Sequence, residues 1–150
     1  MCDHCGCRAY APIADLTAEH VEILRLAASL ADATRYGRPI DQPARGRLVD
    51  LLHLHVAKEE VGLYPMLLSE MGRPADDYAD LEAEHRELFA AIEDNAFDHL
   101  ALYALQRHVE EEEEVLFSGA LFHFDGDTWD DLDAIHRQIN SDHATALGRV

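Results

Sequence analysis

Two segments of this 150-residue chain repeat one pattern, and that pattern strongly constrains the fold. HVAKEEVGLY begins at His55 and HVEEEEEVLF begins at His108, and both read H-V-x-x-E-E-x-x-L followed by an aromatic residue. On a helix, residues i and i+4 share one face. The sequence therefore predicts two helices that each carry an imidazole–carboxylate pair, His55 with Glu59 and His108 with Glu112.

The similarity extends to the helix that precedes each segment. AEHVEIL surrounds His20, and AEHRELF surrounds His85. The separation is 65 residues between these two histidines but 53 residues between His55 and His108, so the connection inside the first half is the longer one. Internal similarity of this kind indicates two copies of one helical hairpin.

Apolar residues recur at helical spacing along most of the chain, and no segment alternates as a β-strand does. We expect helices at about residues 15–34, 43–71, 75–94, 98–122 and 128–147. Short connections between long helices favour antiparallel neighbours. The predicted fold is all-α, an up-down antiparallel four-helix bundle with a short fifth C-terminal helix. It divides into a cysteine-rich N-terminal segment at residues 1–10 and a bundle domain at residues 11–150.

Several residues predict where these helices begin, end or bend. Asp15 or Thr17 is expected to cap the first helix and Asp127 the fifth, because short polar side chains accept hydrogen bonds from free helix amides. Gly72 marks the end of the second helix. Pro65 lies inside that helix, and a kink is expected there because proline removes a helix hydrogen bond.

The chain is strongly acidic, with a net charge of −18 and a pI near 4.7. Nucleic acids and anionic membrane surfaces would repel it, so neither is expected as a partner. No apolar run approaches the roughly 20 residues of a membrane helix, and no secretory signal is visible, so the expected location is cytoplasmic. An apolar stripe on the last helix predicts packing on the bundle or on a second subunit of a homo-oligomer. That stripe consists of Trp129, Leu132, Ile135 and Ile139.

The repeated pattern places four imidazoles and two carboxylates near the bundle axis. A buried carboxylate without a partner costs several kcal/mol or more. Two metal ions would remove that cost, and imidazole with carboxylate suits iron, manganese or zinc better than calcium or magnesium. The alternative is a set of hydrogen-bonded core histidines without metal. The predicted ligands are His20, His55, Glu59, His85, His108 and Glu112.

These residues resemble the hemerythrin-like, or HHE cation-binding, family, over roughly residues 12–125. The chain is similar to the bacterial type with an N-terminal C-x-x-C-x-C segment. The resemblance implies a four-helix bundle with a non-haem diiron centre whose irons share an oxygen bridge. Glu59 and Glu112 would bridge the irons. His20 and His55 would serve one iron, with His85 and His108 on the other, and dioxygen, peroxide or nitric oxide would bind at an open position.

The chain departs from the oxygen-carrying hemerythrins at the third helix. Those proteins have a second histidine one turn from the first, whereas here the positions one turn from His85 are Leu81 and Phe89. The last carboxylate is also Glu at i+4 rather than Asp at i+5. Water, a small anion, Glu82 or a tyrosine could fill the vacant position. More open coordination favours peroxide chemistry or sensing over reversible oxygen carriage.

The N-terminal segment MCDHCGC concentrates all the cysteines of the chain. The cluster of Cys2, His4, Cys5 and Cys7 predicts a second metal or redox site, holding zinc, an iron–sulfur cluster or a redox-active thiol pair. The alternative is a tail without such a role. His136 and His143, two turns apart on the last helix, are candidate donors to this cluster.

Other acidic and imidazole groups are expected to lie away from the ligands. Glu111 is a weaker alternative to Glu112, and the run from Glu110 to Glu114 is expected to be mostly a solvated face. A surface or outer position is expected for His53, His99 and His123.

Two classes of function are consistent with this pattern. The first is a diiron protein that binds or reacts with dioxygen, peroxide or nitric oxide, with peroxide decomposition as its candidate activity. The second is a non-catalytic module that senses iron or redox state.

Overall fold

The computed structural model describes residues 9–148, and within that range the chain is helical with no strand. Its elements are α1 (Ala11–Arg35), α2 (Gln42–Ala57), η2 (Lys58–Leu63), α3 (Tyr64–Met71), α4 (Ala79–Glu93), α5 (His99–Glu111), η3 (Glu112–Leu116), α6 (Phe117–His123) and α7 (Gly126–Ala146). The segments η2 and η3 are π-helical, with i→i+5 hydrogen bonding.

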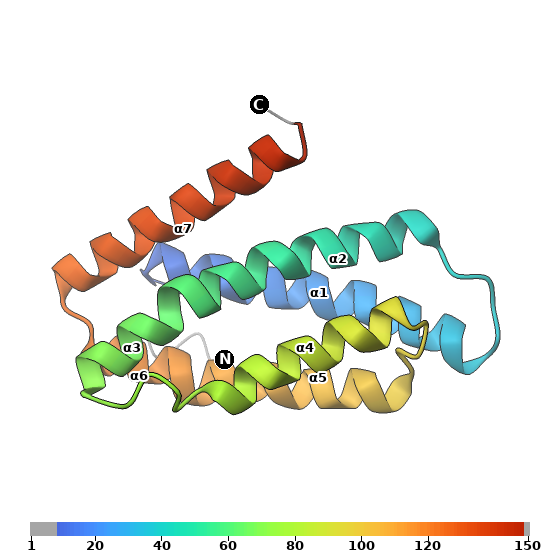
Figure 1. Cartoon of the computed structure of the whole chain (residues 1–150), viewed down its shortest axis with the longest axis horizontal. Helices are drawn as coiled ribbons and strands as arrows, with labels where there is room; N and C mark the ends of the chain where they lie inside the picture. The colour runs from blue at the N-terminus through green and yellow to red at the C-terminus, as the bar shows by residue number, and fades with distance from the viewer. Residues whose placement is uncertain (1–8, 149–150) are drawn as a thin grey trace.

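These elements form four rods and one additional helix. The first rod is α1, the second is α2–η2–α3, the third is α4 and the fourth is α5–η3–α6. Successive rods run back and forth beside one another, and α7 leaves the bundle at an angle (Figure 1). The prediction of an all-α four-helix bundle with a fifth C-terminal helix is confirmed. No helix between residues 9 and 148 combines the length and apolar character needed to cross a membrane.

The predicted starts of three helices were wrong by a few residues. α1 begins at Ala11, with Pro12 in its first turn and no side-chain cap, so Asp15 and Thr17 lie inside the helix. Proline is tolerated there because the first amides of a helix have no internal partner. α4 begins at Ala79, because residues 75–78 form a turn.

The start of α7 and the end of α3 each have a recognisable capping residue. α7 begins two residues earlier than predicted because Asp125, rather than Asp127, accepts a 2.8 Å hydrogen bond from the Thr128 amide. Gly72 ends α3 in a left-handed conformation with φ 63°, a conformation that glycine adopts without steric cost. The predicted end of the second rod is confirmed.

A π-helical segment precedes Pro65, where the sequence predicted a kink. Pro65 is the second residue of α3 and directly follows η2. The fourth rod makes the same kind of π-helical segment before Ser118, the residue that occupies the equivalent position. Proline is therefore compatible with the change in hydrogen bonding and is not required for it.

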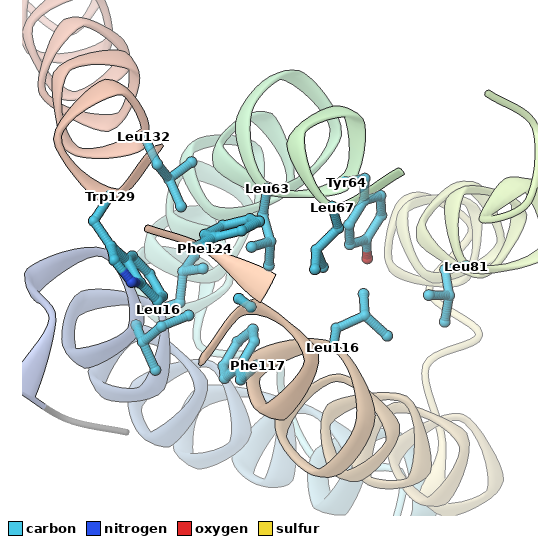
Figure 2. Close-up of a cluster of buried hydrophobic side chains, with 12 residues drawn as sticks. Leu16, Leu63, Tyr64, Leu67, Leu81, Leu116, Phe117, Phe124, Trp129 and Leu132 are labelled. Atoms are coloured by element: carbon cyan, nitrogen blue, oxygen red, sulfur yellow. The ribbon is translucent and has the colours of Figure 1, made fainter. Parts of the chain in front are cut away.

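Two apolar clusters fill the bundle, one toward each end. The cluster near α7 contains Leu16, Leu63, Leu116, Phe117 and Trp129, as Figure 2 shows. The other contains Ile23, Leu26, Leu48, Leu52, Phe97, Leu105 and Val109. Along every rod, the predicted ligands lie between residues of the first cluster and residues of the second. A buried polar layer therefore separates two dry cores.

Candidate metal centre

The six predicted ligands meet in this polar layer, and each is at most 8% exposed. The Nε2 atom of His55 lies 2.9 Å from Oε1 of Glu59, and the Nε2 atom of His85 lies 3.2 Å from Oε2 of the same residue. Around the second carboxylate, Nε2 of His20 lies 3.0 Å from Oε2 of Glu112. The i,i+4 geometry recurs there, with Nε2 of His108 2.8 Å from Oε1 of Glu112.

These atoms form two overlapping donor groups. One contains His20, His55, Glu59 and Glu112, and the other contains Glu59, His85, His108 and Glu112. In each group one donor atom per residue lies within 4.8 Å of all the others. Each histidine belongs to one group, whereas both glutamates belong to both. This is the arrangement of two cation positions joined by two carboxylates.

The imidazole nitrogens and carboxylate oxygens of the two groups are better placed to bind cations than to form hydrogen bonds with one another. Both oxygens of Glu59 are buried and neither makes a hydrogen bond, although imidazole nitrogens lie close by. Nε2 of His85 also faces Nε2 of His108 at 3.0 Å. Buried polar atoms nearly always have partners, so unpaired lone pairs aimed at a common volume disfavour a purely hydrogen-bonded core. The donors present suit a metal such as iron, manganese or zinc.

Each of the four histidines also contacts a carboxylate through its other ring nitrogen. The Nδ1–carboxylate distances are 2.8 Å for His55 with Glu19, 2.8 Å for His85 with Glu60, 2.5 Å for His108 with Glu84 and 3.2 Å for His20 with Glu113. Such contacts orient the ring, leave Nε2 free to face a metal and raise the basicity of the ligand. The sequence analysis missed these four glutamates.

The outer carboxylates follow the internal repeat. Glu19 and Glu84 are the E of the two A-E-H motifs, and each contacts the histidine of the next rod in its own hairpin. Glu60 and Glu113 are the second E of the two E-E pairs, and each contacts a histidine of the opposite hairpin. The doubled motif thus encodes ten residues of one pseudo-symmetric site, and the repeated E beside each predicted ligand was the available signal.

The electrostatics of the site favour charge on every group. Burial alone would lower the pKa of His20, but hydrogen bonds to Glu112 and Glu113 raise it to about 11. Carboxylates likewise raise the pKa of His85 to about 10 against the effect of burial. The reverse applies to Glu59, where neighbouring imidazoles lower the pKa to about 2 although burial opposes this. In the metal-free site the imidazoles therefore hold protons, which metal ions would displace.

One aromatic ring from each hairpin lies against a histidine. Tyr64 stacks on His85 with 6.1 Å between ring centroids, and Phe117 stacks on His20 at 5.6 Å. These aromatic residues occupy equivalent positions of the repeat, but only Tyr64 has a hydroxyl. That hydroxyl donates a 2.6 Å hydrogen bond to Oε1 of Glu112. A tyrosine was one of the candidates for the vacant position, and Tyr64 is the tyrosine that reaches the site.

The helix α7 makes the two halves of the site unequal. Lys58 is 2% exposed and pairs with Glu19, the carboxylate that contacts His55. The backbone carbonyl of Lys58 accepts a 3.0 Å hydrogen bond from Nε2 of His136 on α7. A Cβ atom on Gly62 would lie 3.1 Å from the His136 ring, so glycine permits this close approach. In the fourth rod, Glu111 at the position equivalent to Lys58 is exposed.

The structure also shows where the other acidic residues near the predicted ligands lie. Glu111 is exposed whereas Glu112 is buried, so the preference for Glu112 agrees with the structure. Glu82 is half-buried and belongs to neither donor group. The acidic run is mostly exposed, as expected, and besides Glu112 the exception is Glu113, which contacts His20 from the π-helical segment.

The remaining histidines lie away from the two donor groups. His53 stacks on Phe89, and the side chains of His53, His99 and His123 are exposed, as expected. His136 contacts Lys58, and His143 is half-buried. The predicted cluster of Cys2, His4, Cys5 and Cys7 lies outside the described residues, so its role stays a prediction.

Comparison with known proteins gives one match. A search of curated proteins found no match, and neither did a search of solved structures. The family profile described as the hemerythrin HHE cation binding domain matches residues 11–103. His20, His55, Glu59 and His85 lie within that range, and the fold adds His108 and Glu112 from beyond it. Because the match spans more than half of the chain, the protein belongs to the hemerythrin HHE cation-binding domain family.

Proposed function

We propose that this protein holds two iron ions and binds or reacts with dioxygen, peroxide or nitric oxide. Family membership and the buried His/Glu clusters together indicate a metal-binding site. The observation that carries the proposal of two ions is the pair of four-residue donor groups that share Glu59 and Glu112. In this proposal His20 and His55 hold one iron, and His85 and His108 hold the other.

The protein residues prepare the site before any ligand arrives. Four carboxylate–imidazole contacts fix the ring orientations, so little reorganisation accompanies metal binding. When bound, the two irons would supply electron transfer and Lewis acidity to a small ligand. The apolar clusters on either side exclude water, which strengthens electrostatic interactions inside the site.

Space for a small ligand exists beside the histidines. A cavity of about 10 Å³ is bounded by the four imidazoles and by an apolar wall. That volume accommodates about one water-sized molecule. The apolar wall consists of Ile23, Leu52, Val56, Leu88, Leu105 and Val109. A diatomic molecule or peroxide fits this description better than a larger anion.

The hydroxyl of Tyr64 is the one neutral proton donor that contacts a carboxylate of the site in the described residues. Burial and the adjacent carboxylates raise its pKa far above the ordinary tyrosine value, so it stays protonated at neutral pH. We propose that Tyr64 keeps this hydrogen bond to Glu112 and so stabilises the negative charge of that carboxylate.

The direct test is metal analysis combined with ligand addition. Protein loaded with ferrous iron under argon should bind close to two irons per chain and change its optical spectrum on addition of peroxide, dioxygen or nitric oxide. Peroxide consumption well above that of free iron would support an enzyme. Binding of these ligands without turnover would support the alternative, a sensing module. The contact between His136 of α7 and the π-helical segment favours that alternative, because it links the site to a peripheral helix.

We also propose that the cysteine cluster within residues 1–10 is separable from the diiron site. Every residue of the two donor groups lies on α1 or beyond. A truncated chain should retain Tyr10, because its ring stacks on Trp129 at 4.2 Å. Such a chain should keep its irons and lose any zinc, iron–sulfur signal or thiol response. Loss of iron on truncation would contradict the division.

A further inference from the structure

Because the chain contains two copies of one helical hairpin, the packing of helices in one copy can be compared with that in the other. In the first hairpin, α1 and α2 pack through Leu26, Leu48 and Leu51. The offsets of 65 and 53 residues place Ala91, Ala101 and Ala104 at the equivalent positions of α4 and α5. Three leucines of one hairpin are therefore alanines in the other. The second hairpin has much less side-chain volume with which to close the space between its helices.

A cleft of about 750 Å³ opens where those leucines are missing. All of its walls come from α4, α5, η3 and the connection between α4 and α5. The three alanines line it, and so do His85 and His108. The cleft therefore leads from the surface to the two histidines of one donor group.

The volume and lining of the cleft match an organic molecule better than a diatomic one. Pockets for small organic ligands measure roughly 300–1,000 Å³ and combine apolar walls with a few polar groups. Leu88, Phe97 and Leu105 provide apolar wall beside the alanines. A diatomic ligand needs only a small fraction of this volume.

The charged groups around the cleft determine whether it favours a positively or a negatively charged ligand. Five carboxylates line it, from Glu84, Glu87, Glu110, Glu111 and Glu114, whereas Arg107 is the one guanidinium. Most of these carboxylates lie on exposed positions of α4, α5 and η3, at the rim of the cleft. A negative rim above an apolar wall favours a cation with an apolar body and repels an organic anion.

We propose that this cleft binds an amphipathic organic cation, such as an alkylamine, beside the metal position of His85 and His108. The apolar body lies against Leu88, Phe97 and the alanines, and the ammonium group lies among the rim carboxylates. Binding of this molecule follows from the cleft itself. Its position beside an iron ion rests on the diiron function proposed above.

Isothermal titration of the full-length protein tests the binding. The probes are octylammonium and octanoate, which share one chain length and differ in charge. Octylammonium should bind the wild type with a dissociation constant at least about ten-fold lower than that of octanoate. No octylammonium binding at millimolar concentration, or tighter binding of octanoate, would overturn the proposal.

Two variants locate the binding. The double substitution Ala101→Leu with Ala104→Leu restores the leucines of the first hairpin and should abolish octylammonium binding. Ala90→Leu adds the same side chain at an exposed position of α4 outside the cleft and should leave binding unchanged. Equal binding to wild type and to the filled variant would overturn the proposal.

A charge variant keeps the test informative if the filled variant fails to fold. Glu87→Gln with Glu110→Gln changes two exposed rim carboxylates without removing apolar volume. It should weaken octylammonium binding several-fold, and unchanged binding would count against charge selection. Nitric oxide binding, followed by optical spectroscopy on the ferrous-iron-loaded protein, should persist in the filled variant and in the charge variant. Absent nitric oxide binding in the wild type would contradict the diiron function and leave the titration result standing.

Discussion

Tyr64 donates a 2.6 Å hydrogen bond to Oε1 of Glu112, and its equivalent in the other hairpin, Phe117, has no hydroxyl to donate. Both rings stack on a histidine of the site, so the positions of the two aromatic rings follow the internal repeat. The hydroxyl group does not follow it, because only Tyr64 has one. The two donor groups therefore share their residue types, whereas the polar contact from Tyr64 to one of their two shared carboxylates has no counterpart in the other hairpin.

Substitution Tyr64→Phe should make the two halves of the site more alike. The iron content should stay at two per chain, because Glu112 keeps its imidazole neighbours. The lost hydrogen bond should lower the free energy of unfolding by about 1–3 kcal/mol. The ligand-dependent optical bands of the iron-loaded protein should shift. Thermal denaturation and optical titration check this, with Phe89→Tyr, outside both donor groups, as the control. A Tyr64→Phe protein without iron would mean that the tyrosine is itself a ligand.

The outer carboxylates Glu19 and Glu84 form a matched pair for testing the repeat. Each contacts the Nδ1 atom of a histidine, so Glu19→Gln and Glu84→Gln should each weaken metal affinity by about 10- to 100-fold. The effects on stability should differ, because Glu19 also pairs with buried Lys58. Glu19→Gln should cost about 3–5 kcal/mol, since it leaves that ammonium without its partner. Competition with a metal chelator and denaturant titration measure the two effects, and equal stability losses would contradict the assigned role of Lys58.

The metal-free and metal-loaded proteins should respond to pH with opposite signs. Carboxylates raise the pKa of His20 to about 11, so its stabilising contribution is complete below about pH 6.5 and is lost as pH rises toward 11. Glu59, with a pKa of about 2, contributes above about pH 4.5 and loses this contribution as pH falls. Metal binding requires deprotonated imidazoles, so stabilisation by metal should increase with pH. Melting temperatures between pH 5 and 10 for both forms check this, and parallel profiles would contradict it.

The contact between His136 and the Lys58 carbonyl predicts a role for α7 in stability. His136→Phe removes a buried hydrogen bond to a carbonyl of the π-helical segment, which should cost about 0.5–1.5 kcal/mol. Burial lowers the pKa of His136, so the wild-type contribution should be present above about pH 6.5 and decrease as pH falls. Denaturant titration at pH 7 and pH 5.5 measures both effects. His143→Phe, at a half-buried position of the same helix, is the matched control, and an equal loss there would contradict a specific contact.

The six inner residues of the site could be predicted because they obey a local rule. His55 with Glu59 and His108 with Glu112 are i,i+4 pairs, and the helical repeat adds His20 and His85. The outer glutamates could not be assigned in the same way, because each contacts a histidine on another rod. Their partners depend on how the rods pack against one another. The helical period of the sequence gives no information about that packing.

A tyrosine was among the candidates for the vacant position, but Tyr64 could not be singled out, for a different reason. The sequence was interpreted with an α-helical period, which places residue i+5 away from residue i. The Tyr64 amide instead donates to the carbonyl of Glu59, and the Phe117 amide donates to that of Glu112, each across a π-helical turn. The wider turn brings both aromatic rings against the histidines. The departure from the regular helix thus lies at the functional site, as π-helical segments often do.

Metal analysis of the wild type beside His20→Ala and His85→Ala tests the central claim most directly. The two donor groups share their glutamates but not their histidines, so each substitution should empty one position. The account predicts close to two irons per chain in the wild type and about one in either variant. Full iron content in both variants, or a wild type that binds a single iron, would contradict it.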